Sequence, residues 1–558
     1  MTQAIDTPLA PAERADLVFP RLTAAQMARV EAHGRKRSVA SGEVLFEPGQ
    51  GLARFYVVTS GAVEIVMKSA AMDQLIAVLE PGMFTGEVNM LSGRPGFAVI
   101  RAREASEVID VDRSELLGFI QTDADLSAIL MRAFLLRRAE IVAKGLGAVV
   151  LVGSMYCTET LRIKEFLTRN GFPYSYLDVE RDEGVRALID RFHVSPSDFP
   201  VLICRGEVLL RNPSNRDIAD CLGFNESIDR IHLRDVVVVG AGPSGLAAAV
   251  YAASEGLDAL VVESSAPGGQ AGTSSRIENY LGFPAGISGD ELAARAYSQA
   301  QKFGAPVLIA RQAIRLRCDQ TPYIVELDDG ARIAARTVVI ATGAKYRKLG
   351  LESLSRFEGA GVYYAATFME SQLCGGDEVA VVGGGNSAGQ AALFLAQTAR
   401  RVHLLIRAGG LAESMSRYLI RRIERDTAIV MRTYSEIAAL EGNGHLERIR
   451  LRDNRTGATE TKDVRHVFSM TGAVPNTDWL QRCVSLDANG FIKTGTALGP
   501  EDLATARWSQ ARQPFPLETT LPGVFAVGDV RSGNYKRVAS AVGEGSTAIA
   551  SVHQVLAQ

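Results

Sequence analysis

The stretch Val236-Val-Val-Val-Gly240-Ala-Gly242-Pro-Ser-Gly245 is an apolar run that ends in three closely spaced glycines. A buried strand that turns into a helix in this way leaves backbone N–H groups free at the helix N-terminus, where a pyrophosphate binds. Gly240 allows the tight turn, Gly242 lets the backbone approach the phosphates, and Gly245 keeps helix and strand close. The stretch predicts a dinucleotide site on an α/β sheet.

A second fingerprint follows later in the chain. The apolar run Val379–Val382 leads into Gly383-Gly-Gly385-Asn-Ser-Ala388. The first fingerprint also has the acidic residue that such sites place on a ribose hydroxyl, because Glu263 ends the run Leu260–Val262. Two fingerprints imply two dinucleotides, and the usual reason is to pass a hydride from one to the other.

From Gly240 to its end the chain resembles the low-molecular-weight thioredoxin reductases. The matching stretches are Gly240–Gly245, Pro267–Gln270, Glu278–Tyr280, Thr342–Ala344, Gly383–Ala388, Gly472–Asn476 and Gly528–Asp529. The resemblance implies two Rossmann-like α/β domains: a discontinuous FAD domain at residues 232–350 and 474–558, and an NAD(P)H domain inserted at 351–473. It also implies a homodimer.

The resemblance also assigns site residues. Those expected to bind FAD are Gly240, Gly242, Pro243, Ser244, Gly245, Glu263, Gly269, Gln270, Asn279, Thr342, Gly343, Gly528, Asp529, Arg537, Val538 and Ala539. Asp529 would face the ribityl chain, and Arg537–Ala539 would lie near the isoalloxazine. Those expected to bind NAD(P)H are Gly383, Gly385, Asn386, Ser387, Ala388 and Arg407.

NADPH is expected rather than NADH at the second fingerprint. Arg407 matches a family arginine that binds the 2′-phosphate, and no acidic residue ends that strand. Arg417, Arg421 and Arg422 follow on a predicted helix, where they either assist or form a solvated face. NADH stays the alternative.

One stretch departs from the family. Thioredoxin reductases carry Cys-x-x-Cys where this chain reads Ala365-Ala-Thr-Phe368. That dithiol passes electrons by thiolate attack, which alanine and phenylalanine cannot perform. Cys374 has no cysteine three positions on and is interpreted as a buried small apolar residue. Disulfide reduction therefore does not follow from the two fingerprints.

The region 22–147, after a tail at 1–21, predicts an antiparallel β-roll with helices at Thr23–Ala32 and Asp125–Ala143. Phe55–Gly61 and Ala62–Lys68 are predicted to form a strand–glycine–strand pair. The region resembles cyclic-nucleotide-binding domains at Gly42–Gly49, Phe55–Gly61 and Gly82–Glu87.

In that family a Gly-Glu pair and a later arginine bind the cyclic phosphate and ribose. Gly86 and Glu87 match, but Gly96 occupies the arginine position and Arg94 is the nearby substitute. Two interpretations stay open: a site for cAMP or cGMP, and a roll used only for docking or regulation.

Residues 148–231 predict the order βαβαββα, which resembles the thioredoxin–glutaredoxin fold. Phe199-Pro200 fits the cis-proline position of that fold. Cys157 would lie at a helix N-terminus, where the helix dipole acidifies a thiol, but Thr160 replaces the second cysteine. Cys157 is thus a candidate one-thiol catalytic residue, and the alternative is a docking or spacer domain with an incidental thiol.

Composition bounds the remaining possibilities. The 558 residues carry a net charge of −3, and the chain lacks a helix-turn-helix after the roll, so no nucleic-acid partner is expected. The six cysteines form no zinc-ligand cluster, so they are expected to be reduced thiols of a cytoplasmic protein without a metal. The apolar runs are too short to span a bilayer, and no signal pattern opens the sequence, so no membrane association is expected.

The sequence therefore predicts a multidomain FAD-dependent oxidoreductase that receives hydride from NADPH. Its acceptor stays open among three hypotheses. Electrons pass to a disulfide or thioredoxin-like partner, with or without Cys157; or they pass directly to oxygen, a quinone or another small molecule; or the sites serve a redox sensor with little turnover. In each case the N-terminal roll is expected to regulate the rest.

Overall fold

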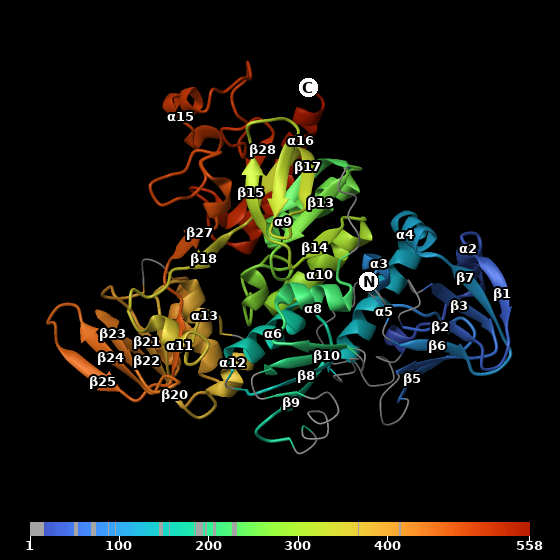
Figure 1. Ribbon diagram of the computed structural model, residues 1–558, viewed down its shortest axis with the longest axis horizontal. Helices are drawn as coiled ribbons and strands as arrows, with labels where there is room; N and C mark the ends of the chain where they lie inside the picture. The colour runs from blue at the N-terminus through green and yellow to red at the C-terminus, as the bar shows by residue number, and fades with distance from the viewer. Residues whose placement is uncertain are drawn as a thin grey trace.

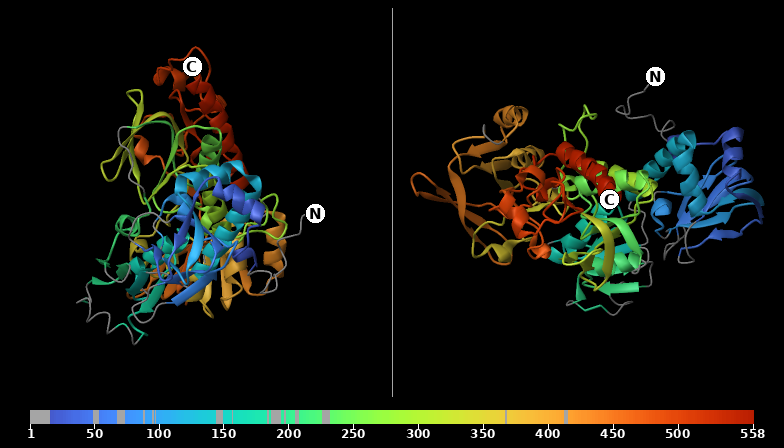
Figure 2. Two further views of the ribbon diagram at one scale, coloured as in Figure 1. Left: turned by 90° about the vertical axis from the view of Figure 1, so that its right-hand side faces the viewer. Right: turned by 90° about the horizontal axis from the view of Figure 1, so that it is seen from above.

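The computed structural model describes residues 16–48, 54–67, 74–87, 89–94, 96, 98–143, 149–155, 157–182, 185, 194–195, 198–204, 208–225, 232–366, 368–411 and 415–558. Figure 1 shows the β-roll at one side, the sheet around β20 at the opposite side, and the sheets around β12 and β8 between them. Figure 2 shows the same bodies from two further directions.

The N-terminal body is the predicted β-roll. One sheet has the order β1-β7-β3 and the other β2-β6-β4-β5. The strands are β1 (Arg35–Val39), β2 (Val44–Phe46), β3 (Phe55–Ser60), β4 (Val63–Met67), β5 (Gln74–Leu79), β6 (Val99–Ala102) and β7 (Ser106–Val111). The helices are α2 (Ala24–Glu31), α3 (Asn89–Ser92), α4 (Arg113–Thr122) and α5 (Ala124–Ala143). Thr23 begins α2 through a capping box with Gln26.

The predicted pairing of the strands around Gly61 is wrong. β3 pairs with β7, whereas β4 pairs with β5 and β6, so the two strands lie in different sheets. Gly61 has φ +76°, and a Cβ there would overlap the Ser106 side chain. The glycine therefore carries the chain from one sheet to the other instead of closing a hairpin.

The next body is a sheet of order β11-β10-β8-β9, called here the β8 sheet. Its strands are β8 (Val149–Gly153), β9 (Ser175–Asp178), β10 (Val201–Cys204) and β11 (Val208–Arg211), and its helices are α6 (Thr158–Arg169) and α8 (Asn215–Leu222). β8 and β9 are parallel and β10 is antiparallel to β8. The Phe199–Pro200 peptide is cis, as expected. The second helix of the predicted βαβαββα order, expected at residues 183–192, lies outside the described residues except for Val185.

The first fingerprint lies in the β12 sheet, whose order is β14-β13-β12-β17-β16-β15, with β28 beside β17. The strands are β12 (Leu233–Val239), β13 (Ala259–Glu263), β14 (Val307–Ile309), β15 (Ala313–Arg317), β16 (Tyr323–Leu327), β17 (Arg332–Ile340) and β28 (Val524–Ala526). The helices α9 (Pro243–Ser254), α10 (Gly289–Lys302) and α16 (Val538–Leu556) accompany it. β28 comes from the end of the chain, which shows that two separate segments build this sheet.

The second fingerprint lies in the β20 sheet, of order β19-β26-β20-β21-β22. Its strands are β19 (Val362–Tyr363), β20 (Glu378–Val382), β21 (Arg401–Leu405), β22 (Ile429–Arg432) and β26 (His466–Ser469). Beside them lie α11 (Leu354–Phe357), α12 (Phe368–Leu373), α13 (Asn386–Leu395), α14 (Arg417–Arg425) and a sheet of β23 (Ser435–Glu441), β24 (Arg448–Asp453) and β25 (Thr459–Lys462). The parallel strands confirm a second Rossmann-type unit.

A short ribbon joins these two units. β18 (Ala344–Tyr346) leads the chain out of the β12 sheet, and β27 (Ala473–Pro475) leads it back, with the two strands paired antiparallel. Thr342 Oγ1 donates to the Asn476 carbonyl at 2.8 Å, and Asn476 Nδ2 donates to the Thr342 carbonyl at 2.9 Å. The ribbon therefore holds the entry and exit of the inserted unit together.

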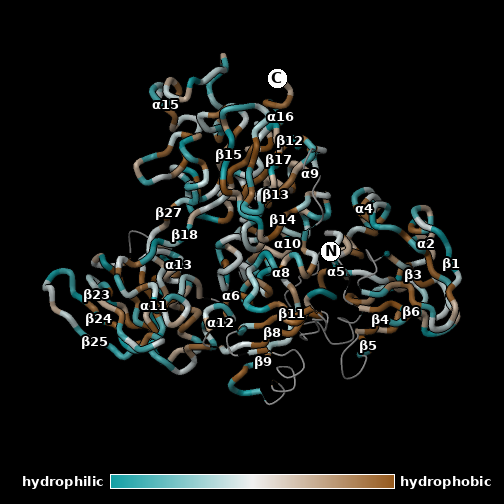
Figure 3. The backbone as a smooth tube through the Cα atoms, in the orientation of Figure 1, coloured by the Kyte–Doolittle hydropathy of each residue, from teal (hydrophilic) through white to brown (hydrophobic). Residues whose placement is uncertain are grey.

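Apolar residues concentrate in the central strands of each body (Figure 3). Val236–Val238 in β12 and Val379–Val381 in β20 are each fully buried. Among the residues that the structure describes, none of the helices is both long and apolar enough to cross a membrane.

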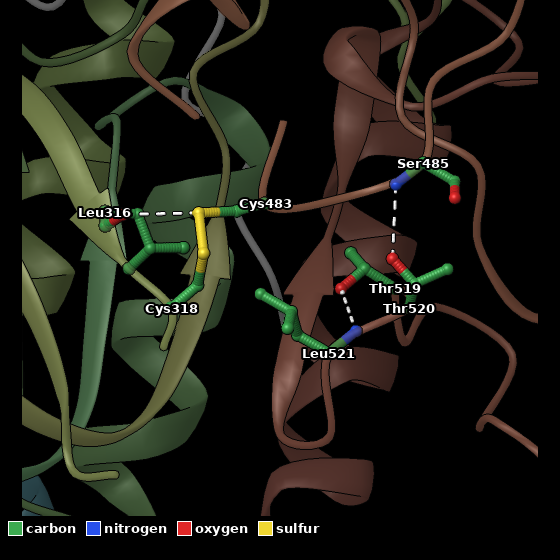
Figure 4. Close-up of a disulfide and its surroundings, with 7 residues drawn as sticks. All are labelled: Leu316, Cys318, Cys483, Ser485, Thr519, Thr520 and Leu521. Atoms are coloured by element: carbon green, nitrogen blue, oxygen red, sulfur yellow. Dashed lines mark hydrogen bonds between the residues drawn. A yellow bond between two sulfur atoms is a disulfide. The ribbon is translucent and has the colours of Figure 1, made fainter. Parts of the chain in front are cut away.

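The expectation that all six cysteines are thiols is wrong. Cys318, just after β15, forms a disulfide with Cys483, and their Cα atoms lie 5.9 Å apart (Figure 4). The two residues are 165 positions apart because the whole β20 unit is inserted between them. No spacing motif could indicate this pair, since the fold rather than the sequence brings the two segments together.

This disulfide is expected to stabilise the β12 sheet by restricting the unfolded chain, by about 2–4 kcal/mol. Cys318→Ser should therefore lower the melting temperature of the FAD-loaded protein in a calorimetric scan. Dithiothreitol should lower the melting temperature of the wild type and leave that of Cys318→Ser unchanged. A wild type that melts at the same temperature with and without the reductant would contradict the assignment.

Candidate active site

The first glycine turn has no room for side chains. Gly240 has φ +108°, and a Cβ there would overlap the Ala341 carbonyl oxygen. A Cβ on Gly245 would overlap the Gly240 carbonyl oxygen, so helix and strand touch through backbone. Helix α9 begins at Pro243, Ser244 in its first turn is buried, and its N-cap Gly242 supplies no side-chain hydrogen bond. The first N–H groups of α9 are therefore suited to bind phosphate oxygens.

A second loop completes this cradle. A Cβ on Gly269 would lie 3.0 Å from the Gly242 Cα atom, so two glycines face each other across the cradle. Gln270 donates its side-chain amide to the carbonyl of Ala344 at the start of β18. With no side chains between them, the two glycines let a pyrophosphate approach the backbone.

Glu263 lies at the end of β13, where the sequence predicts a ribose contact. Its side chain is buried, with Oε2 accepting from the Ala241 N–H at 2.7 Å and Oε1 from the Ser265 N–H at 2.8 Å. These bonds fix the carboxylate beside the glycine turn. The site therefore has both the anion cradle and the ribose acceptor that an adenine dinucleotide needs.

The other end of the predicted FAD site is built from the last segment. Gly528 and Asp529 follow β28, and Arg537 is the N-cap of α16, with Val538 and Ala539 in its first turn. Burial raises the pKa of Asp529, a shift that Lys536 opposes and Glu544 reinforces. Asn279 is exposed on the loop after β13, and Gly343 has φ +62° beside the ribbon.

Glu544 is a residue that sequence reasoning missed. Its Oε2 accepts from the Gly528 N–H at 2.7 Å, and its Oε1 accepts from Asn534 Nδ2 at 2.8 Å and pairs with Arg531. It therefore holds the Gly528–Asp529 turn from within helix α16. No motif marks it, because its role depends on where α16 packs.

The second glycine turn repeats the first. Gly383 has φ +145°, and a Cβ there would lie 2.6 Å from the Met470 carbonyl oxygen. Gly385 is the N-cap of α13 without a side-chain hydrogen bond, and Ala388 is fully buried against the strand. Asn386 does not leave its carbonyl oxygen for a ligand, because Oδ1 accepts from the Ser416 N–H at 2.7 Å. The start of α13 again presents its first backbone N–H groups to a pyrophosphate.

The two fingerprints lie close to one another. The half-buried Tyr346 of the ribbon makes a hydrogen bond with Ser387 of the second fingerprint, and the charge of Asp529 in the first site helps to raise the Tyr346 pKa. Burial raises the pKa of Tyr346. Arg422 of α14 pairs with Glu278 of the other unit, with N–O distances of 2.7 and 3.0 Å. The structure therefore brings α13 and α14 against the FAD half.

The arginines predicted to bind the 2′-phosphate lie in two places, one after β21 and the others on α14. Arg407 is exposed just after β21, where the strand ends beside the second glycine turn. Arg417 and Arg421 are exposed on α14. Arg422 is engaged with Glu278, so it does not extend the phosphate site in this arrangement.

The dithiol position carries no thiol. Ala365 is half-buried before α12, and Phe368 begins that helix. Cys374 is fully buried and donates its thiol to the Glu370 carbonyl at 3.0 Å. Burial raises its pKa to about 12, so Cys374 is no nucleophile at neutral pH. The interpretation of Cys374 as a buried small residue is confirmed.

Cys157 lies at the N-cap of α6, as predicted, and is half-buried. The next residue, Thr158, packs against the β20 unit, since a Cβ on Gly359 would lie 2.6 Å from Thr158 Cγ2. The structure therefore brings the Cys157 end of α6 to the unit that carries the empty dithiol position.

The predicted ligand residues of the roll share one cavity, but two of them also have protein partners. Gly86, Glu87 and Arg94 all line one cavity of the roll. Glu87 pairs with Arg138 of α5 at 3.5 Å, and Arg94 donates to Tyr297 of α10 at 2.9 Å. Arg94 is therefore shared between the cavity and a neighbouring body.

Two glycine turns that each follow a parallel strand, one of them with a buried ribose acceptor, define a two-dinucleotide oxidoreductase. The family model described as pyridine nucleotide-disulphide oxidoreductase matches residues 234–545, and the chain belongs to this family. A model described as cyclic nucleotide-binding domain matches residues 36–123. The protein is an NAD(P)H-dependent flavoprotein oxidoreductase of the thioredoxin reductase class, with FAD and NADPH as cofactors.

Thioredoxin reductases are among its relatives. That of Mycolicibacterium smegmatis is 33% identical over 331 residues, which cover 58% of this chain and 97% of that protein. That of Mycoplasma genitalium is 31% identical over 319 residues, covering 57% and 94%. The crystal structure of T. acidophilum thioredoxin reductase matches with a TM-score of 0.52 at 28% identity, over 58% of this chain and 99% of that one.

The backbone contact at Gly245 gives a direct test of the first cradle. Gly245→Ala forces a methyl group against the Gly240 carbonyl oxygen. We therefore expect the free energy of unfolding to fall by about 1–3 kcal/mol. We also expect the variant to lose most of its bound FAD. The FAD-to-protein absorbance ratio and a urea titration measure both. The matched control is Gly118→Ala in α4, where the space is open and helix propensity rises. Full FAD content in Gly245→Ala would argue against the cradle.

Proposed function

We propose that this protein passes the electrons of NADPH to a small acceptor of the quinone class without a protein dithiol. FAD, when bound, supplies the hydride chemistry between the two substrates. The net reaction moves a hydride from NADPH and a proton from solvent to the quinone, which becomes a hydroquinone. The observation that carries the proposal is the dithiol position itself, where Ala365 and Phe368 stand and Cys374 is buried.

The chain's own residues bind and orient the two cofactors in this proposal. The backbone N–H groups of α9 and the carboxylate of Glu263 would hold FAD, and those of α13 would hold the NADPH pyrophosphate. The Tyr346–Ser387 and Glu278–Arg422 contacts support a hydride-competent arrangement, because they hold the second fingerprint against the first unit. The turn fixed by Glu544 would position Asp529.

A second route runs through Cys157. In this proposal the β8 sheet is a thioredoxin-like domain, which the parallel β8–β9 pair, the antiparallel β10 and the cis Phe199–Pro200 bond support. The contact between Thr158 and Gly359 favours it, because it holds the only described thiol at a helix N-terminus beside the β20 unit. A disulfide between Cys157 and a partner thiol would be its substrate.

The proposed domain division follows the sequence boundaries 22–147, 148–231, 232–350 with 474–558, and 351–473. The ribbon of β18 and β27 supports the last two, since it lies at both crossings. The homodimer and the cytoplasmic location stay predictions.

The acceptor is tested by anaerobic NADPH consumption. We expect turnover with menadione, and none with thioredoxin and DTNB, because no reachable dithiol receives the electrons. The variant Ala365→Cys/Phe368→Cys restores the missing pair and should gain disulfide turnover. Thioredoxin reduction by the wild type that Cys157→Ser abolishes would replace the quinone proposal with the Cys157 route.

Arg407 is expected to select NADPH. Arg407→Ala should raise the KM for NADPH about tenfold, the loss of one charged hydrogen bond, and leave the KM for NADH nearly unchanged. Steady-state kinetics with menadione measures both constants. Arg422→Ala is the matched control, because Arg422 pairs with Glu278 and should not alter the ratio of the two constants. An unchanged ratio in Arg407→Ala would remove Arg407 from the site.

A further inference from the structure

The β-roll encloses a cavity of about 140 Å³ that is mostly apolar. Its apolar lining comes from Val18, Phe19, Phe46, Ile65, Ile100 and Ile141, among others. Such a volume is close to the roughly 150 Å³ of a cavity that holds one benzene ring. The size and lining of the cavity therefore suit a ligand with a single aromatic ring rather than a larger polar ligand.

Two buried arginines also line this cavity. Arg137 is 5% exposed; its Nε donates to the Val18 carbonyl and its Nη1 to the Gly86 carbonyl, both at 2.8 Å. Its Nη2 is buried and has no hydrogen-bond partner among the described residues. Burial lowers the pKa of Arg137 to about 9, and the nearby Glu87 carboxylate only partly opposes this shift. An unpaired guanidinium N–H in such a place is costly unless a ligand accepts from it.

Arg94, which also lines the cavity, repeats this pattern. It is also 5% exposed, and its Nη2 donates to the Tyr297 hydroxyl while its Nε is buried without a partner in the described part of the chain. Two unpaired guanidinium N–H groups on one cavity match the two oxygens of a single anionic group.

A cyclic nucleotide fits this cavity poorly. The family's arginine position is Gly96, and Glu87, which would accept from the ribose, faces Arg138 at 3.5 Å. Apart from Arg54, Glu87 and Glu140, the remaining lining offers apolar groups rather than partners for a purine edge.

We propose that the cavity binds a small aromatic carboxylate, whose two oxygens accept from Arg94 and Arg137 and whose ring lies against the apolar wall. The site differs from the dinucleotide sites and does not rest on the identity of the electron acceptor.

This site lies next to the flavin-binding unit. The guanidinium of Arg94 stacks on Phe224 of the β8 body at 4.4 Å and contacts Tyr297 in α10 of the β12 unit. Gln121 of α4 donates to the Lys302 carbonyl at the end of the same helix. A ligand that accepts from Arg94 Nε therefore fixes a side chain shared by the roll and both neighbours, and it should raise the melting temperature of the whole chain.

The test uses calorimetric titration of the FAD-loaded full-length protein with benzoate, benzamide and cAMP. Benzoate should bind at least tenfold more tightly than benzamide, because only the carboxylate pairs with both arginines, and it should bind more tightly than cAMP. Equal binding of benzoate and benzamide, or binding of cAMP in preference to benzoate, overturns the proposal.

Two variants locate the ligand. Arg137→Leu should lose at least tenfold in benzoate affinity, whereas Arg132→Leu, an exposed arginine of the same helix outside the cavity, should not. Since Arg137 also bonds to backbone carbonyls, Ala98→Leu gives a second test that fills the cavity and leaves both arginines in place. Benzoate binding that survives Ala98→Leu would place the ligand elsewhere and refute the site.

Discussion

Both crossings of the chain between the two nucleotide units pass through the ribbon of β18 and β27, and the candidate site depends on this constraint. The reciprocal bonds between Thr342 and Asn476 lock the crossings together, and Gln270 ties the first cradle to the start of β18. Tyr346 then extends from the same ribbon to Ser387. One backbone pairing thus fixes how the NADPH unit faces the FAD unit.

The residues that bring electrons to the flavin differ from those that would carry electrons away from it. Entry needs backbone cradles, which both glycine turns provide, and a ribose acceptor, which Glu263 provides at the first turn. Exit in a dithiol enzyme needs a thiolate near Ala365, and the nearby Cys374 is buried with a pKa of about 12. The described thiol at a helix N-terminus is Cys157, which belongs to a different body. Family membership therefore establishes the half-reaction in which NADPH reduces FAD. The half-reaction that reoxidises FAD depends on the residues that replace the dithiol in this chain.

Sequence patterns predicted the features that depend on residues close together in the chain. The glycine turns, Glu263 and the cis Phe199–Pro200 bond depend on neighbouring residues, so the sequence alone indicated them. Contacts set by packing were missed or wrong. The two strands around Gly61 separate into different sheets, Cys318 meets Cys483 across an inserted unit, and Glu544 reaches the Gly528 turn from α16. Arg94 was expected as a ligand residue, but its contact with Tyr297 could not be foreseen.

The central claim is that no protein dithiol exchanges electrons with the flavin. Anaerobic titration of the FAD-loaded protein with dithionite, followed by flavin absorbance, counts the electrons directly. We expect complete bleaching after two electrons per FAD, because the dithiol position carries Ala365 and Phe368 in place of a thiol pair. Bleaching that requires four electrons per FAD would reveal a disulfide in equilibrium with the flavin and would contradict the claim.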